Sequence, residues 1–290
     1  MRQGRHSISE LVDEEVAGVV QRVAARLSEI SGVAAVVLGG SWSRGGSDPI
    51  SDIDLGIYYR VSDSPSIEAL RSAAADLDTG GSPPVATDFG EWGPWVNGGA
   101  WLEVGSQKVD WLYRELERVS TTIDDCVAGR PTCDYYLGHP HGFHNHIYLA
   151  EVHYCRPVFD PRGVLEELKD RVRIYPPGLK QALIRKYSYD AGFMLELARK
   201  PAKRGDVYHV SGCLFRCAAA LIQVLFARNQ RYFMNEKGSL VLTDQFSDRP
   251  SSFSTRVSAL LSHPGESSES LERSLDAMEK LCQETFEICS

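Results

Sequence analysis

The sequence predicts an α+β fold in two parts, a unit of helices and short strands followed by an α-helical bundle. Short β-branched or alternating apolar runs occur within residues 1–125. Beyond residue 160, apolar residues instead recur at helical spacing over long stretches. A chain of 290 residues, 43% of them hydrophobic, can bury a core in each part. We therefore expect domains at 1–125 and 161–290, joined by a connecting segment at 126–160.

The first part is expected to open with an amphipathic helix. Ser7 and Glu10 form an S-x-x-E capping box, and apolar residues then recur at three- and four-residue steps as far as Ile30. The strands that follow are indicated by β-branched or alternating runs, two of them joined by a turn at Gly105. The expected strands are 33–38, 51–59, 100–104 and 107–114, with a short helix at 67–77.

The second part is expected to form a helical bundle. Its apolar periods are separated by proline-rich or serine-rich stretches, as between helices. Cys213 and Cys217 lie four apart in an apolar helix and are interpreted as core residues. The seven cysteines lack the even, closely spaced pattern of a disulfide framework, so free and mostly buried thiols are expected. The expected helices are 163–173, 178–199, 206–229 and 268–288.

Composition and charge argue against several kinds of partner. The formal charge is -8, with 39 acidic against 31 basic residues, which disfavours binding to a nucleic-acid backbone. The first residues lack the apolar core of a signal peptide. The longest apolar stretch, 213–227, is interrupted by Arg216 and is too short to span a bilayer. A cytoplasmic protein without a membrane partner is expected, and no pattern specifies an oligomeric state.

Two aspartates of the run "SDIDLGIYY" are the first candidate site residues. Residues two apart on a strand point to the same side, so Asp52 and Asp54 would project together while Ile53 and Leu55 pack inward. Two nearby carboxylates repel each other unless a cation lies between them, and their hard oxygen atoms suit Mg²⁺. Aspartate is also common in turns before a strand, and this interpretation competes for an isolated D-x-D pair.

The loop before these aspartates favours a phosphate site. Gly39, Gly40 and Ser41 follow the expected strand 33–38, and glycines let the backbone come close to an anion while amide and hydroxyl groups donate to it. Arg44 adds a fixed positive charge that can hold a phosphate through two hydrogen bonds. The loop and the two acids together therefore predict a metal and phosphate site.

These residues resemble the signature of the DNA polymerase β-like nucleotidyltransferase superfamily. "GGSWSRGGSDPISDIDLGIYY" is similar to the "GS…RG…SDIDL" form of its small-molecule branch, the aminoglycoside and lincosamide nucleotidyltransferases and their uncharacterised relatives. "RYFMNEKG" is also similar to a segment of those relatives. The resemblance implies a small mixed sheet with helices, followed by a helical domain.

The family's third carboxylate would lie on a neighbouring strand between two apolar residues. Asp110 in "KVDWLY" and Glu103 in "WLEVG" both have that setting. Asp110 is favoured because its strand is longer and is followed directly by "RELER". Glu103 stays the alternative.

The resemblance implies a Mg²⁺-dependent nucleotidyltransferase. Asp52, Asp54 and Asp110 would hold two Mg²⁺ ions, and a nucleoside monophosphate, expected to be AMP from ATP, would pass to a hydroxyl of a small molecule with release of pyrophosphate. Gly40, Ser41 and Arg44 would bind the triphosphate, and Asp110 could also act as general base. The acidic composition favours a cationic acceptor, as in antibiotic modification. The alternatives are modification of a tRNA or a protein, and a non-catalytic nucleotide-binding module.

Four further features have competing interpretations. Lys186 lies off the buried face of its helix; it is either solvated or, as in related two-domain transferases, a ligand of the triphosphate. Asn235 and Lys237 form a capped turn or contact substrate. The tryptophans of "EWGPWVNGGAW" cover an apolar edge or stack on a base or sugar. Histidines gather between 139 and 153 and either bind zinc or line the acceptor pocket; they are His139, His141, His144, His146 and His153.

Overall fold

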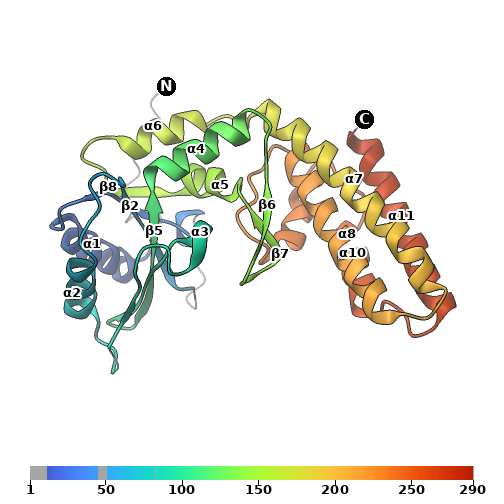
Figure 1. Ribbon diagram of the computed structural model, residues 1–290, viewed down its shortest axis with the longest axis horizontal. Helices are drawn as coiled ribbons and strands as arrows, with labels where there is room; N and C mark the ends of the chain where they lie inside the picture. The colour runs from blue at the N-terminus through green and yellow to red at the C-terminus, as the bar shows by residue number, and fades with distance from the viewer. Residues whose placement is uncertain (1–11, 45–50, 82, 290) are drawn as a thin grey trace. The chain divides into compact units, whose positions relative to one another are not determined.

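The computed structural model describes residues 12–44, 51–81 and 83–289, which form two compact units (Figure 1). Unit 1 holds the described residues up to Ile123 together with Tyr148–Arg173. Unit 2 holds Asp124–Ile147 and the described residues from Ile174 onward. The chain therefore leaves unit 1 after Ile123 and returns to it at Tyr148.

Unit 1 is built on a six-stranded sheet with the strand order β3-β4-β5-β2-β1-β8. The strands β2 and β5 run parallel, and the other neighbouring strands run antiparallel. The expected α+β fold with a small mixed sheet is therefore confirmed. The strands are β1 (Val33–Leu38), β2 (Ile53–Tyr59), β3 (Val85–Ala86), β4 (Gly99–Val104), β5 (Gln107–Glu115) and β8 (Arg156–Phe159).

Helix α1 (Glu14–Ser28) begins later than the sequence pattern suggests. The side chain of Asp13 accepts a hydrogen bond from the backbone N–H of Val16 at 2.8 Å, which satisfies one of the first amides of the helix. Val12 and Asp13 are not helical, so the helix cannot begin at Ser7 as one uninterrupted segment. The expected capping box of Ser7 and Glu10 lies outside the described residues.

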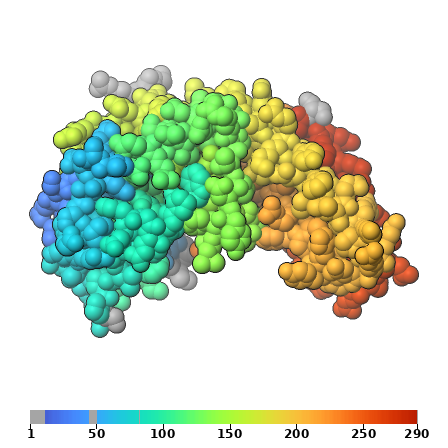
Figure 2. All heavy atoms as spheres, viewed as in Figure 1, coloured from blue at the N-terminus to red at the C-terminus, as the bar shows by residue number. Residues whose placement is uncertain are grey.

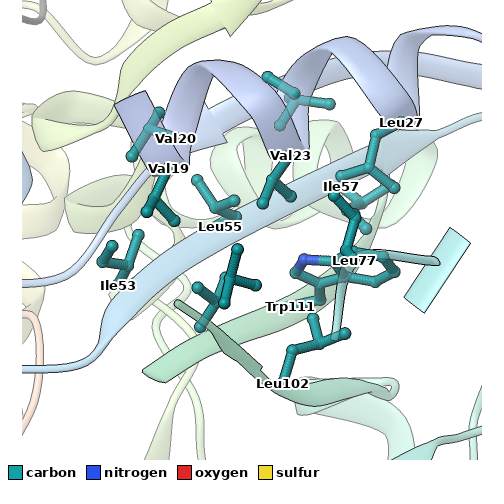
Figure 3. Packing of buried hydrophobic residues seen from close by; sticks show 14 of the residues in the cluster. Val19, Val20, Val23, Leu27, Ile53, Leu55, Ile57, Leu77, Leu102 and Trp111 are labelled. Carbon is teal, nitrogen blue, oxygen red and sulfur yellow. The ribbon is translucent and has the colours of Figure 1, made fainter. Parts of the chain in front are cut away.

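The core of unit 1 lies between one face of the sheet and the helices α1 and α2 (Ile67–Leu77). In Figure 3, apolar side chains of α1 point toward those of β2, with Trp111 of β5 beside them. These side chains are at most 5% exposed, and each such burial contributes roughly 1.5–3 kcal/mol. They are Val19, Val20, Val23 and Leu27 from α1 and Ile53, Leu55, Ile57, Leu102 and Trp111 from the sheet.

The helix α5 (Ile147–Tyr154) is fixed to the sheet by polar contacts. The guanidinium of Arg114 on β5 donates two hydrogen bonds of 2.8 Å to the carboxylate of Glu151. The hydroxyl of Tyr148 donates to the carbonyl of Trp95. Lys169, on α6 (Val164–Arg171), donates from Nζ to three carbonyls at the end of α5, at 2.8 to 2.9 Å. This lysine satisfies acceptors that a helix C-terminus leaves without internal partners.

Residues 148–173 belong to unit 1, whereas a connecting segment at 126–160 and a helical domain at 161–290 were expected. The short strand β8 pairs with β1 and forms an edge of the sheet. Its four residues, "RPVF", are too few to show an alternating pattern, and its partner lies far away in the sequence. The shorter elements of unit 1 are η2 (Trp42–Arg44) and α3 (Gly93–Val96), and α4 (Leu116–Val127) extends from it into unit 2.

Unit 2 combines a β-hairpin with helices, of which α7 and α8 pack along each other, as the yellow and orange segments of Figures 1 and 2 show. The four expected long helices are confirmed as α6 in unit 1 and as α7, α8 and α11 in unit 2. Two elements of unit 2 were not expected. One is the hairpin of β6 and β7, and the other is the helix α10, which lies inside the serine-rich stretch 247–267. The elements are β6 (Cys133–Tyr136), β7 (His139–His144), α7 (Pro177–Ala202), α8 (Val207–Arg228), α9 (Ser239–Leu242), η3 (Thr243–Gln245), α10 (Phe253–Ser262) and α11 (Ser268–Cys289).

Helix α8 is a long, apolar helix of unit 2. Among the described residues it alone is long and apolar enough to cross a bilayer, and 78% of its most apolar window is buried inside the fold. That burial is typical of the core helix of a soluble protein. Cys213 and Cys217 are buried in it as expected, and the sulfur of Cys217 lies 3.5 Å from that of Cys282. All seven cysteines are free thiols, five of them buried.

Candidate active site

The parallel pairing of β2 with β5 places Asp54 directly opposite Asp110. Their neighbours along the strands, among them Leu55 and Trp111, are fully buried in the core that α1 and α2 cover. Because successive side chains of a strand alternate, both aspartates project from the opposite face. Both are half-buried there, and adjacent strands lie about 4.8 Å apart. Two carboxylates from distant parts of the chain therefore share one side of the sheet.

The glycine loop after β1 lies against Asp54. The backbone N–H of Gly39 donates to the carbonyl of Asp54 at 2.8 Å. Gly40 has a φ of +58°, and a Cβ at this position would lie 1.8 Å from Oδ2 of Asp54. A side chain at residue 40 would therefore collide with the carboxylate and would also strain the backbone. Only glycine lets the loop approach this acid so closely.

A short helical turn, η2, follows the two glycines and is held by hydrogen bonds. The hydroxyl of Ser43 donates to the carbonyl of Gly40 at 2.9 Å, and the indole N–H of the buried Trp42 donates to the carbonyl of Ser51 at 3.1 Å. Ser41 is half-buried just before this turn, and Arg44 at its end is exposed. Ser41 and Arg44 thus lie within four residues of Gly40, the residue that contacts Asp54.

Two residues beside this loop were not expected from the sequence. The guanidinium of Arg44 lies 5.9 Å from the centre of the Tyr154 ring, within reach of a cation–π contact. Arg156 on β8 donates from Nε to the carbonyl of Ser43 at 3.2 Å. The loop therefore has a second guanidinium next to it, and only the pairing of β8 with β1 reveals this.

Asp52 and Glu103 occupy different positions from the Asp54–Asp110 pair. Asp52 precedes β2 and is exposed. Glu103 is exposed on β4, opposite Lys108 of β5. Within residues 12–44, 51–81 and 83–289, no group of three or more histidine, cysteine or acidic side chains has the arrangement of a metal site. The structure thus brings Asp54 and Asp110 together, and the roles of Asp52 and of the third carboxylate stay predictions.

Lys186 lies in unit 2, on α7. Its ammonium is 3.0 Å from the carboxylate of Asp190, one helical turn later, and 5.1 Å from the centre of the Tyr187 ring. Both the lysine and the aspartate are partly exposed, so this ion pair contributes little to stability. A role of Lys186 toward the triphosphate stays a prediction.

The clustered histidines divide between the two units. In unit 2, His139 lies 3.1 Å from the carboxylate of Glu236, and His144 is 2.7 Å from the hydroxyl of Tyr187. Burial lowers the pKa of His144 to about 2, with a further contribution from His146, and burial lowers the pKa of His146 to about 4. His153 belongs to unit 1, where its ring contacts the carbonyl of Val172.

Three further candidate residues, His141, Asn235 and Lys237, also lie in unit 2. His141 packs on the ring of Phe215, with a centroid distance of 4.5 Å, and burial lowers its pKa. Asn235 is half-buried and Lys237 is exposed, just before α9. The histidines of unit 2 therefore pair with Glu236, Tyr187 or aromatic rings.

Comparison with known proteins supports the interpretation of the first part of the chain. Residues 20–96 match the family described as nucleotidyltransferase domain, and this range includes the glycine loop, Asp52 and Asp54. Residues 144–237 match a domain of unknown function (DUF4037). Among curated proteins, no sequence matches the chain.

One solved structure similar to this chain is a nucleotidyltransferase-like protein from Exiguobacterium sibiricum. It shares 11% sequence identity and has a TM-score of 0.42, and the similarity covers 89% of this chain and 71% of that one. Because this structural similarity is weak, the function is inferred from the family match alone. It supports the polymerase β-like superfamily for the first part of the chain, an enzyme as the class of protein, and nucleotidyl transfer as the general activity.

Proposed function

We propose that this protein transfers a nucleoside monophosphate, AMP from ATP, to a hydroxyl of a small-molecule acceptor. The observation that carries the proposal is the strand register, which puts Asp54 opposite Asp110 on the sheet face away from the core. The backbone of Gly40 also lies in direct contact with the Asp54 side chain. Aspartates on neighbouring strands beside a glycine-rich loop are the groups that this reaction requires. The formal charge of -8 favours a small, cationic acceptor over a nucleic acid.

The donor atoms at this site suit a hard divalent cation. Carboxylate oxygens from two adjacent strands are the ligands that Mg²⁺ prefers. Asp54 and Asp110 would hold the metal, with Asp52 contributing from the segment before β2. When bound, two Mg²⁺ ions would neutralise the triphosphate and favour ionisation of the acceptor hydroxyl.

The residues of unit 1 account for the other parts of the reaction. Ser41, Arg44 and the amides of the loop would hold the β- and γ-phosphates. The Asp110 carboxylate would take the proton of the acceptor hydroxyl. A bond forms between that oxygen and the α-phosphorus, while the bond from the α-phosphorus to the bridging oxygen breaks. Pyrophosphate leaves with the electron pair of the broken bond.

A pyrophosphate-release screen tests this proposal. The purified protein is incubated with Mg²⁺ and each of the four nucleoside triphosphates, across hydroxylated acceptors that include amino sugars, a tRNA and a protein. We expect acceptor-dependent release with ATP and a small molecule, which Asp54→Asn abolishes. The matched control is Asp63→Asn, which alters an exposed aspartate of the same unit. Release only with the tRNA or the protein would contradict the small-molecule acceptor.

A thermal-shift experiment tests the metal separately. We expect Mg²⁺ together with ATP to raise the thermal midpoint more than either does alone, because a ligand that binds only the native state stabilises it. The Asp54→Asn variant should lose this synergy. Equal stabilisation by ATP in the presence of a chelator would contradict a metal bridge between the carboxylates and the phosphates.

A further inference from the structure

Strand β4 extends the row of Asp54 and Asp110 by one more residue, Trp101. Trp101 lies directly opposite Asp110 in the antiparallel pairing of β4 with β5. Ala100 and Leu102, on either side of it, are buried in the core with α1 and α2. Residues directly opposite in a sheet project to the same side, so Trp101 lies on the face that carries both aspartates.

Trp101 presents a large aromatic surface to solvent. Its side chain is 53% exposed, although tryptophan side chains are usually mostly buried. Trp92 stacks on it, with the ring centroids 4.8 Å apart and an angle of 26° between the rings. Gly99 makes room for this arrangement, because a Cβ there would lie 2.9 Å from the Trp92 ring and 1.8 Å from the carbonyl of Trp111. The two indoles therefore form a supported flat surface beside Asp110.

The order of the strands assigns this surface to one end of the site. The glycine loop follows β1, which borders β2 on the side away from β5. Trp101 lies on β4, which borders β5 on the side away from β2. The row across the sheet therefore runs from the loop through Asp54 and Asp110 to Trp101. A triphosphate held by the loop leaves the Trp101 end for the other substrate.

We propose that Trp101, supported by Trp92, is the stacking platform for the acceptor, and that the acceptor carries its reactive hydroxyl on a ring with an apolar face. This inference rests on the proposed function, because it takes Asp110 as the acid that faces the acceptor. Opposite residues of antiparallel strands have their Cα atoms about 4.5 to 5.5 Å apart. A ring stacked on Trp101 thus holds its hydroxyl one strand spacing from the Asp110 carboxylate.

The platform restricts the class of acceptor. The C–H face of a sugar ring packs on an indole, and an ammonium group on that ring gains a further attraction to the aromatic face. An acyclic alcohol lacks such a face. The acceptor is therefore a glycoside or a similar cyclic alcohol. The other planar group within reach would be the base of the nucleotide, which the experiment separates from the acceptor ring.

The first test measures binding without turnover. Ligand-observed NMR is recorded with methyl α-glucoside and kanamycin as ring probes and glycerol as the acyclic probe. The protein is held with Mg²⁺ and an ATP analogue in which a methylene group replaces the oxygen between the α- and β-phosphorus atoms. We expect a ring probe to bind the wild type, to lose at least about tenfold in affinity with Trp101→Ala, and to recover most of it with Trp101→Phe. If no ring probe binds the wild type, the inference is overturned.

The second test uses the nucleotide alone. Calorimetric titration with Mg²⁺ and the ATP analogue should give the same affinity, within about twofold, for the wild type, Trp101→Ala and the control Tyr208→Ala, which removes a 92% exposed ring of unit 2. A weaker nucleotide affinity of Trp101→Ala with unchanged binding of the ring probes would assign the platform to the base and overturn the inference. If the nucleotide does not bind the wild type, the proposed function itself fails.

Discussion

At the scale of single residues, the site depends on which acid lies beside Asp54. Asp110 is its direct neighbour on β5, whereas Glu103 lies on β4 opposite Lys108. We expect Asp110→Asn to lower kcat at least about a hundredfold while the affinity for ATP changes little, because a general base contributes about 10² to 10⁴ in rate. Steady-state pyrophosphate release and nucleotide titration measure the two effects.

The matched control for this prediction is Glu103→Gln, which alters an exposed acid on the same sheet face. We expect it to keep kcat within a few-fold of the wild type. A large loss of kcat in Glu103→Gln with near-normal activity in Asp110→Asn would move the third carboxylate to β4.

Gly40 offers a second test at residue scale. In Gly40→Ala the new methyl group would overlap Oδ2 of Asp54, at a φ that favours glycine. We expect activity to fall about a hundredfold, the effect of moving a catalytic group by about 1 Å, while far-UV circular dichroism is unchanged. Gly18→Ala is the control, since a Cβ on this exposed glycine of α1 meets nothing within 4 Å. It should keep full activity and gain about 0.5–1 kcal/mol of stability.

At the scale of elements, the ion pair of Arg114 and Glu151 attaches α5 to β5. Desolvation opposes the charge on Arg114, but the Glu151 carboxylate outweighs it and raises the pKa of the guanidinium. Arg114 is 4% exposed, so Glu151→Ala would leave a buried charge without its partner. We expect a loss of about 3–5 kcal/mol in the free energy of unfolding, measured by urea denaturation.

Two further variants separate this charge effect from the loss of a side chain. Asp76→Ala breaks the exposed pair with Arg26 and should cost less than about 1 kcal/mol. The double variant Arg114→Met/Glu151→Leu should recover most of the lost stability, because no unpaired charge remains. A double variant as unstable as Glu151→Ala would show that packing dominates instead.

Elements with a strong local pattern could be predicted from the sequence, and those that depend on distant partners could not. The β1 and β2 segments carry β-branched or alternating apolar residues, and α7, α8 and α11 carry long helical periods. The strand β8 has four residues, one of them proline, and forms only because β1 presents an edge to it. The helix α10 lies within a serine-rich stretch whose composition indicates a loop.

The same distinction holds for the candidate site. The glycine loop and Asp54 are close in sequence, so one motif identifies them together. The pairing of Asp110 with Asp54 depends on which strands become neighbours, and the D-x-D pattern carries no such information. The sequence leaves two interpretations of the tryptophans open, and a role for Trp101 follows only from its register opposite Asp110.

At the scale of the whole molecule, buried neutral histidines predict sensitivity to acid. His144 and His146 have pKa values of about 2 and about 4 in the folded protein, against about 6.5 in an unfolded chain. Below pH 6.5 the unfolded state therefore binds more protons than the folded state, so stability falls as the pH falls. Each histidine contributes a slope of about 1.4 kcal/mol per pH unit between its two pKa values.

Urea denaturation at pH 7.5 and pH 5.5 measures this effect. We expect unit 2 to lose at least about 2–3 kcal/mol between the two conditions, because the lowered pKa of His141 adds to the loss, and we expect His146→Leu to lose about 1.4 kcal/mol less than the wild type. Glu236, whose pKa is lowered beside His139 although burial alone would raise it, titrates below this range and does not add to the change. A wild type with equal stability at both pH values would show that the histidines become protonated in the folded state.

The return of the chain to unit 1 has a consequence for the order in which the protein can fold. Val36 of β1 pairs with Phe159 of β8, so this edge of the sheet stays open during synthesis until the hairpin of β6 and β7 has also emerged from the ribosome. An open edge offers its backbone groups to other chains. Pairings between such distant segments also slow folding, because a long loop must close first.

A nascent chain that pauses after α4 would therefore carry both aspartates on an incomplete sheet, without the Glu151 that Arg114 requires. Chaperone association during synthesis should peak in that interval and decline once α5 and β8 have docked.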